Sequence, residues 1–169
     1  MKNYVVIGAG FSAASVIKVL VNKNIKPLAD KPLIAYSIAA AKKSKLINRI
    51  IVSTDSEKYA NLAKEYGAEV PFLRPAELAG DTSTDYDFIK HLLDWLEKNE
   101  GSTPDYLIHL RPTTPLRDPK IIDNAIGELI NHSGATALRS AHEMPETAYK
   151  MCEVEDGYFK SLRNLHSGM

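Results

Sequence analysis

Apolar residues along the chain alternate between short continuous runs and longer runs with helical spacing. The short runs are rich in β-branched residues and predict strands at Tyr4–Ile7, Arg49–Ser53 and Tyr106–Leu110. The helical spacing predicts helices at Leu33–Lys43 and Ser56–Tyr66. A third helix is predicted to begin at one of the capping residues Asp81–Thr84 and to end at Glu97, and a fourth is opened by Asp118 and Pro119. Shorter runs predict strands at Glu69–Phe72, Ala135–Leu138, Ala148–Val154 and Tyr158–Lys160, the last two joined by a turn at Asp156–Gly157.

This order of elements defines the expected fold class. Strands that alternate with helices of ten or more residues indicate βαβ units and a mainly parallel sheet. Right-handed crossovers then place helices on both faces, so we predict one α/β domain over residues 1–169, a three-layer α/β/α arrangement of Rossmann-like type. Ligands in such sheets bind beyond the carboxyl ends of the strands, which directs attention to the loops there.

Composition narrows the possible partners. The chain has 21 Lys plus Arg and 21 Asp plus Glu, so its formal net charge is zero, and we expect neither nucleic acid nor membrane as a partner. The apolar N-terminal stretch is interrupted by Gly8, Gly10 and Lys18, so we predict neither a signal peptide nor a membrane span. A single cysteine, Cys152, fits a reducing compartment, and we expect a cytoplasmic protein.

The first candidate loop is basic and precedes a helix. Lys23, Lys26 and Lys31 stand close together, with prolines stiffening the path between them. Ammonium groups and helix N-terminal N–H groups suit a polyphosphate. The alternative is an ordinary solvated basic loop.

The second candidate loop is residues 72–85, and it contains a proline-ordered arginine. Arg74 offers a planar, bidentate donor to a base carbonyl or a phosphate. Ser83 is a candidate ligand contact or a simple helix cap. Asp85 stands early in the following helix, where the dipole favours an acid whether or not it binds anything.

The third candidate loop follows the strand Tyr106–Leu110 and reads R-P-T-T-P-L-R. Arg111 stands at the end of that strand, where it would point into the ligand crevice. Arg117 lies just before a helix, and a structural salt bridge is the simpler expectation for it. His109 lies inside the strand and is expected to belong to the core.

Four segments in this order resemble the acylneuraminate cytidylyltransferases. The segments are KNIKPLADKPLIAYSI, IIVSTDS, YGAEVPFLRPAELAGDT and LRPTTPLRDP, and the resemblance runs from Asn22 to Lys160. This family includes the CMP-sialic, CMP-legionaminic and CMP-pseudaminic acid synthetases and has a nucleotide-diphospho-sugar transferase-like fold. The resemblance implies attack of an acidic sugar's anomeric hydroxyl on the α-phosphate of CTP, with Mg²⁺ as cofactor. It also implies a homodimer and a role in making cell-surface polysaccharides.

The resemblance also implies roles for individual residues. Lys23 and Asn24 match the Lys-Asn pair near the nucleotide, and Arg74 matches the arginine that contacts the cytosine end. Ser83 and Asp85 take positions beside the base and ribose. Arg111 and Thr113 fall next to the acceptor sugar, a nine-carbon acid, and Lys23 and Arg111 are the catalytic candidates. Many sialic acid enzymes have glutamine where this chain has Arg111, so the arginine would meet the sugar carboxylate or mark a different sugar. The metal ligands are not identified.

Two departures from the family pattern bear on activity. The family's first loop is close to I-P-A-R-G-G-S-K-G, whereas this chain has Ile7–Ser15 as I-G-A-G-F-S-A-A-S, without the arginine and the Ser-Lys pair. Loss of an anchored cation weakens transition-state stabilisation, so impaired turnover is expected. Family members also continue beyond the last residue of this chain, so we expect it to lack the family's C-terminal portion.

Two alternatives remain open at this point. The run Gly8-Ala9-Gly10 with Ala13 after the first strand matches the G-x-G-x-x-A fingerprint for NAD(P), with Phe11–Val21 as the helix behind it. That motif needs a second strand ending in an acid, and Ile25–Ala29 before Asp30 is a poor strand because it contains Pro27. The other alternative is a non-catalytic nucleotide-binding or regulatory paralogue.

Overall fold

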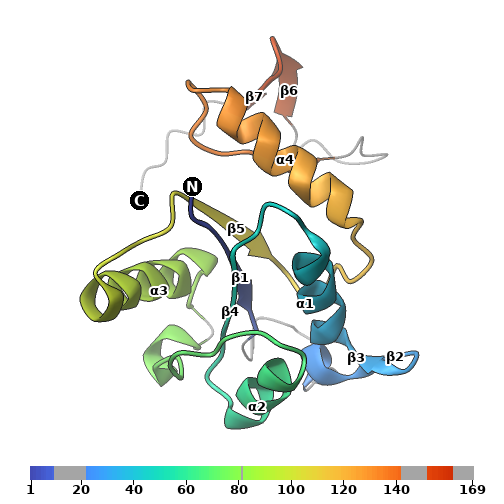
Figure 1. Ribbon diagram of the computed structural model, residues 1–169, viewed down its shortest axis with the longest axis vertical. Coiled ribbons are helices and arrows are strands. Elements are labelled where there is room, and N and C mark those ends of the chain that lie inside the picture. The colour runs from blue at the N-terminus through green and yellow to red at the C-terminus, as the bar shows by residue number, and fades with distance from the viewer. Residues whose placement is uncertain (10–21, 81, 142–151, 162–169) are drawn as a thin grey trace. The chain divides into compact units, whose positions relative to one another are not determined.

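The computed structural model describes residues 1–9, 22–80, 82–141 and 152–161 of the 169-residue chain (Figure 1). It divides into two compact units, Met1–Thr136 and Ala137–Met169. The first unit contains the sheet, its covering helices and the candidate site. The predicted helix Phe11–Val21 and the Gly10–Ala13 part of the dinucleotide fingerprint lie outside the described residues.

The first unit is built on a parallel sheet. Its strands are β1 (Asn3–Gly8), β4 (Arg49–Ser53) and β5 (Tyr106–Leu110), in the order β4-β1-β5. Gly8 is opposite Ser53 on one side of β1, and Ile7 is opposite Leu110 on the other. The carboxyl ends of all three strands therefore meet at one edge of the sheet.

The four helices predicted within the described residues are all present. They are α1 (Leu33–Lys43), α2 (Glu57–Glu65), α3 (Asp85–Glu100) and α4 (Pro119–Asn131). The start of α3 is set by Thr84, whose N–H donates to the Asp87 carboxylate at 2.6 Å, and that of α4 by Asp118, whose carboxylate accepts from Lys120 N–H. Two short 3-10 helices, η2 (Lys23–Ile25) and η3 (Ala76–Leu78), and a two-stranded ribbon, β2 (Pro27–Leu28) with β3 (Lys31–Pro32), complete the unit.

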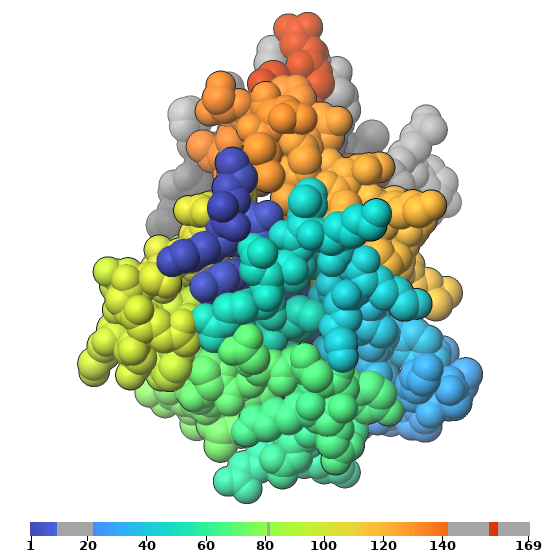
Figure 2. All heavy atoms as spheres, viewed as in Figure 1, coloured from blue at the N-terminus to red at the C-terminus, as the bar shows by residue number. Residues whose placement is uncertain are grey.

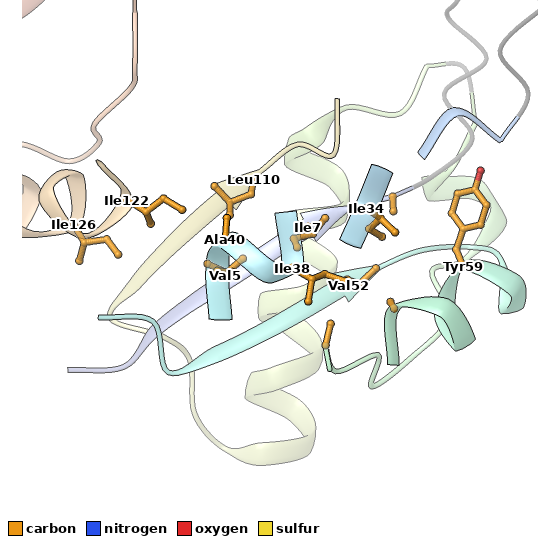
Figure 3. Close-up of a cluster of buried hydrophobic side chains, with 14 residues drawn as sticks. Val5, Ile7, Ile34, Ile38, Ala40, Val52, Tyr59, Leu110, Ile122 and Ile126 are labelled. Carbon is orange, nitrogen blue, oxygen red and sulfur yellow. The ribbon is translucent and has the colours of Figure 1, made fainter. Parts of the chain in front are cut away.

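Two apolar clusters cover the two faces of the sheet. Alternate residues of β1 point to opposite faces, so Val5 and Ile7 enter one cluster while Tyr4 and Val6 enter the other. The first cluster collects residues from α1, α2 and α4, including Ile34, Ile38, Tyr59, Ile122 and Ile126 (Figure 3). The second packs against Phe88, Leu92 and Leu96 of α3. The three-layer α/β/α arrangement predicted from the sequence is therefore confirmed.

The N-terminal end of β1 is held by the segments on either side of it. In the space-filling view its dark-blue atoms lie between the yellow-green atoms of α3 and the cyan atoms that follow α1 (Figure 2). Asn48 N–H donates to the Asn3 carbonyl at 2.9 Å, and Asp105 N–H donates to the Lys2 carbonyl at 2.8 Å. The middle strand of the sheet is thereby fixed at the edge opposite to the candidate site.

The predicted strand Glu69–Phe72 is reduced to a single bridge. Glu69 pairs with Ile51 in parallel, and its N–H donates to the Ile50 carbonyl at 2.8 Å. Pro71 follows two residues later and has no N–H, so the ladder cannot continue. The segment still lies beside β4, but the prediction of a full strand is wrong.

The strand predicted at Ala135–Leu138 is also wrong. These residues have no strand partner within the described ranges and are largely exposed, with Leu138 at 47%. Without burial on either face, an extended segment gains nothing from joining a sheet. The boundary between the two units falls here, after Thr136.

The second unit contains a β-hairpin, as predicted. Strand β6 (Cys152–Glu155) pairs antiparallel with β7 (Tyr158–Ser161). The turn residues Asp156 and Gly157 both have positive φ, 54° and 81°, which a tight two-residue hairpin turn requires. Ala148–Met151, the predicted start of the first strand, lies outside the described residues. Within the described part of the chain, no helix is long and apolar enough to cross a membrane.

Candidate active site

Small and polar residues occupy the carboxyl edge of the sheet on the face covered by α3. Val6 and Ile51 belong to the cluster under α3, so residues two positions further on, Gly8 and Ser53, face the same way. On β5, His109 pairs with Val6. The apolar floor beneath α3 therefore ends in Gly8, Ser53 and His109, where a ligand can reach the sheet.

The ring of Phe88 lies over Gly8. A Cβ added to Gly8 would meet Phe88 Cζ at 2.6 Å, so only glycine allows this close approach. One side of the arrangement is Arg74, whose guanidinium lies 4.6 Å from the ring centroid. The other is His109, whose imidazole meets the ring edge-on at 5.5 Å between centroids. The Phe88 ring thus contacts two polar groups at the end of the sheet.

Arg74 is a buried part of the wall rather than a free surface cation. The residue is 8% exposed, its Nε donates to Ser53 Oγ at 3.1 Å, and its Nη2 donates to the Ser53 carbonyl. Burial lowers the pKa of the Arg74 guanidinium, and the Asp55 and Asp85 carboxylates oppose that shift. Arginine stays charged at neutral pH even so, which leaves a desolvated cation beside the opening.

Asp85 and Arg111 form an ion pair at the mouth of the site. Asp85 is the first residue of α3, and Arg111 directly follows β5. Asp85 and Phe88 are one helical turn apart on α3, while Arg111 and His109 are two residues apart along β5. The Asp85–Arg111 ion pair therefore connects α3 to the end of β5, as the contact between Phe88 and His109 does. The ion pair lies one position further out, at the mouth of the site.

The loop after Arg111 is fixed to α1 through Ser37. Arg117 Nη1 donates to Ser37 Oγ at 3.1 Å, and Ser37 Oγ lies 3.5 Å from the Arg111 carbonyl as a donor. Ser37 is fully buried, and burial lowers the pKa of the Arg117 guanidinium. The salt bridge expected for Arg117 is replaced by this hydrogen bond, which holds the backbone of Arg111 in place.

These features surround one cavity of about 360 Å³ at the carboxyl edge of the sheet. All seven residues that the sequence proposed for the site line it, and they are Lys23, Asn24, Arg74, Ser83, Asp85, Arg111 and Thr113. They come from three candidate loops that are far apart along the chain, so the fold brings together what the sequence only placed in order. Their individual roles remain predictions.

Two of these residues also have structural partners near the cavity. Ser83 Oγ donates to the Glu77 carbonyl at 3.2 Å and so closes the loop that carries η3. The η2 turn that carries Lys23 and buried Asn24 follows Asn22, whose side chain accepts from Tyr59 Oη at 3.2 Å. The cap that the sequence offered for Ser83 is taken by Thr84 instead.

The cavity is locally positive although the whole chain is neutral. Among its described lining residues, Lys23, Arg74 and Arg111 are cationic and Asp85 is the only carboxylate. Burial lowers the pKa of the His109 imidazole below 6.5; Asp85 opposes this and Arg111 adds to it. His109 is therefore neutral at pH 7 and can accept as well as donate a hydrogen bond. Such a cavity suits a polyanion with hydrogen-bonding groups.

The described side chains do not form a magnesium site by themselves. No group of three or more His, Cys, Asp or Glu that could hold a metal occurs in the part of the chain that the structure describes. Asp85, the one carboxylate among the described residues that line the cavity, is already paired with Arg111. Magnesium commonly combines one or two carboxylates with substrate phosphates, so the expected ion stays a prediction.

Comparison with known proteins identifies the family. A model of the Cytidylyltransferase family matches residues 18–158. The chain belongs to the cytidylyltransferase family. This cytidylyltransferase chain is 44% identical over 114 residues to the N-acylneuraminate cytidylyltransferase of Escherichia coli, a match that covers 68% of this chain and 26% of that protein. It is 44% identical over 111 residues to the CMP-N,N'-diacetyllegionaminic acid synthase of Legionella pneumophila, with 64% and 47% covered.

A third relative extends the match along this cytidylyltransferase chain. The post-translational flagellin modification protein B of Campylobacter coli is 36% identical over 136 residues, which cover 80% of this chain and 58% of that protein. The chain therefore spans between about a quarter and three fifths of the length of these relatives.

Solved structures support the fold of this cytidylyltransferase chain. A CMP:2-keto-3-deoxy-manno-octonic acid synthetase complexed with CTP aligns with a TM-score of 0.62 at 17% identity, over 79% of this chain and 49% of that one. A cytidylyltransferase from Leptospira borgpetersenii aligns at 0.58 with 24% identity, over 79% and 51%. The nucleotidyltransferase fold implied by the sequence resemblance is therefore confirmed.

The dinucleotide alternative is not favoured by this arrangement. The sheet neighbours of β1 are β4 and β5, while the segment before Asp30 forms the small antiparallel ribbon of β2 and β3. The second parallel strand that the fingerprint needs at Ile25–Ala29 is not formed. The close approach of the Phe88 ring explains why residue 8 is a glycine, without any bound dinucleotide.

Besides the seven proposed residues, the cavity is lined by Phe88 and His109, which the sequence did not indicate, and by Gly8, which it indicated only as part of the dinucleotide fingerprint. His109 was assigned to the core, yet it stands two residues before Arg111 and shares its face of β5. That spacing was a usable signal. Phe88 could be assigned to the apolar stripe of its helix, but nothing in the sequence shows that its ring reaches the ligand edge.

Proposed function

We propose that this chain forms the CTP-binding part of a nucleotidyltransferase that activates an acidic sugar as its CMP derivative. The observation that carries the proposal is the cavity at the carboxyl edge, which is lined by all seven residues proposed from the sequence and has an excess of positive charge among them. Relatives named for N-acylneuraminate and N,N'-diacetyllegionaminic acid support a nonulosonic acid as the acceptor.

The reaction needs positioning and charge neutralisation more than covalent help. The anomeric hydroxyl oxygen of the sugar attacks the α-phosphorus of CTP and forms the new P–O bond. The bond from that phosphorus to the β-phosphate oxygen breaks, pyrophosphate leaves with the electron pair, and the hydroxyl proton passes to solvent. CTP enters as its magnesium complex.

The roles proposed for individual residues come from the family resemblance, and the shared cavity is what supports them. Lys23 neutralises phosphate charge, Asn24 binds the nucleotide beside it, and Arg74 supplies a desolvated cation at the cytosine end. Asp85 and Ser83 take the ribose side. Arg111, with Thr113, receives the acceptor sugar.

Calorimetric titration with CTP and magnesium tests the nucleotide site. Lys23→Ala should weaken CTP by about 10- to 100-fold, the effect of a lost hydrogen bond between charged groups. Lys120→Ala, an exposed lysine of α4 outside this cavity, is the matched control and should bind as the wild type does. Equal CTP affinity in the wild type and Lys23→Ala would remove Lys23 from the site.

Turnover separates the enzyme from its non-catalytic alternative. Pyrophosphate release from CTP should require an acidic sugar such as N-acetylneuraminic acid and should not occur with a neutral sugar. Tight CTP binding without release for any acidic sugar would favour a nucleotide-binding or regulatory role. We further propose that the protein is cytoplasmic and, from the family resemblance, that it acts as a homodimer. Sedimentation of the purified chain checks the dimer, and cell fractionation checks the compartment.

A further inference from the structure

The ion pair at the mouth of the cavity joins two groups to which the proposed function gives separate ligands. The proposed function assigns Asp85 to the nucleotide and Arg111 to the acceptor, and both residues line the cavity. Their side chains remain 43% and 61% exposed, so the pair meets solvent where a substrate would enter. In this state the Asp85 carboxylate occupies the guanidinium to which an acidic acceptor would bind.

We propose that the acceptor's carboxylate displaces Asp85 from Arg111, so that this ion pair makes the site selective for acidic sugars. The inference rests on the proposed function, because it concerns the sugar side of the same cavity. Asp85 meets the guanidinium through one contact, between Arg111 Nη2 and Asp85 Oδ2, whereas a carboxylate ligand can accept two parallel hydrogen bonds from it. A neutral sugar has no group for this exchange and would have to leave the Asp85–Arg111 pair intact.

The exchange costs little on the protein side. Ion pairs between exposed groups change an equilibrium constant by up to about fivefold, so a ligand can break this one. Once released, the Asp85 carboxylate still stands at the first position of α3, where the helix dipole stabilises a negative charge. It also stays near the buried Arg74 cation, whose pKa it raises.

The backbone at Arg111 is held while its side chain is exposed. Ser37 Oγ donates to the Arg111 carbonyl, and Arg117 fixes Ser37 from the other side. The following Pro112 is buried. The guanidinium can therefore change partners without moving the loop, which makes Arg111 a specificity-determining residue and Asp85 its resident competitor.

Protein NMR titration of the full chain tests the exchange, with the Thr113 backbone N–H resonance as the reporter in every variant and the Arg111 Nε–H resonance as a second reporter wherever Arg111 is present. The probes are N-acetylneuraminic acid and the neutral sugar N-acetylmannosamine. Asp85→Asn removes the competitor and should bind the acid about two- to fivefold more tightly than the wild type. Arg111→Gln should bind it at least about tenfold more weakly. Neither variant should change the response to the neutral sugar.

Asp94→Asn is the matched control. Asp94 is another exposed α3 aspartate, paired with Lys90 at 2.5 Å, and it does not line the cavity. This variant should bind the acid as the wild type does. Equal affinities in Asp85→Asn and the wild type would overturn the inference, as would an acid that binds none of these proteins while CTP binds. Failure of the wild type to bind CTP would instead overturn the proposed function, whatever the acid does.

Discussion

Replacing Gly8 with alanine probes the contact on which the cavity wall depends. The new Cβ would lie 2.6, 3.0 and 3.2 Å from three carbons of the Phe88 ring, all closer than the 3.5–4.0 Å of a normal contact. Phe88 is 4% exposed, so its ring cannot swing into solvent. It must instead shift within a packed cluster, toward or away from Arg74 and His109.

The expected cost follows from two opposing effects. Forcing a methyl group into a packed core costs about 1–3 kcal/mol. Alanine also restricts the unfolded chain, which returns about 0.4–1 kcal/mol because Gly8 does not have a positive φ. The net loss in the free energy of unfolding should therefore lie between about 0 and 2.6 kcal/mol, with a midpoint of about 1.3 kcal/mol. CTP should bind more weakly, because the displaced ring no longer supports Arg74.

Urea unfolding and CTP titration of the same samples measure both effects. Gly127→Ala is the control, since a Cβ at that α4 position meets nothing within 4 Å and should stabilise the helix by about 0.5–1 kcal/mol. A double variant with Phe88→Leu should recover part of the Gly8→Ala loss, because the smaller side chain leaves room. A Gly8→Ala protein as stable as the wild type, with no coupling to Phe88→Leu, would refute the reasoning.

Three further predictions concern groups away from this contact. Burial raises the pKa of the Asp123 carboxyl, but hydrogen bonds from Ser44 and the two following N–H groups outweigh it and leave the pKa below 3.8. The stability from Asp123 is present above its unfolded pKa and lost as pH falls through its folded pKa, so Asp123→Asn should flatten the acid limb of urea-unfolding stability against pH. Because burial lowers the pKa of His109, the unfolded state takes up the proton first as pH falls below 6.5; stability should fall there, and NMR should give His109 a pKa under 6.5. Arg49→Ala removes the 2.6 Å pair with Glu100 and should cost about 1–2 kcal/mol in urea unfolding without changing CTP affinity.

The sequence predicted the helices well because their signals are local. The range Leu33–Lys43 was found to the residue, and Asp118 with Pro119 marked the start of α4. Strands whose burial depends on distant partners were harder to predict. Val70 and Ala135 both lie in runs that look extended, but Pro71 ends the first ladder and exposure leaves the second without a partner.

The site was predicted in composition but not in geometry. Motif order pointed to Arg74, Asp85 and Arg111, and all three line one cavity. The sequence could not show that Arg74 is anchored on Ser53 or that Asp85 and Arg111 are ion-paired, because each contact joins segments separated by more than twenty residues. Such contacts depend on the strand order and on the register of the sheet.

Thermal unfolding of the chain with magnesium plus CTP, UTP, ATP or NAD in turn tests the nucleotide site most directly. A ligand at about 100 times its dissociation constant adds roughly 2.7 kcal/mol to the free energy of unfolding. For a chain of 169 residues this raises the midpoint by about 5–11 °C. The proposed function predicts that CTP gives this shift and that the other three give little or none. A shift with NAD alone, or none with CTP at saturating concentration, would contradict it.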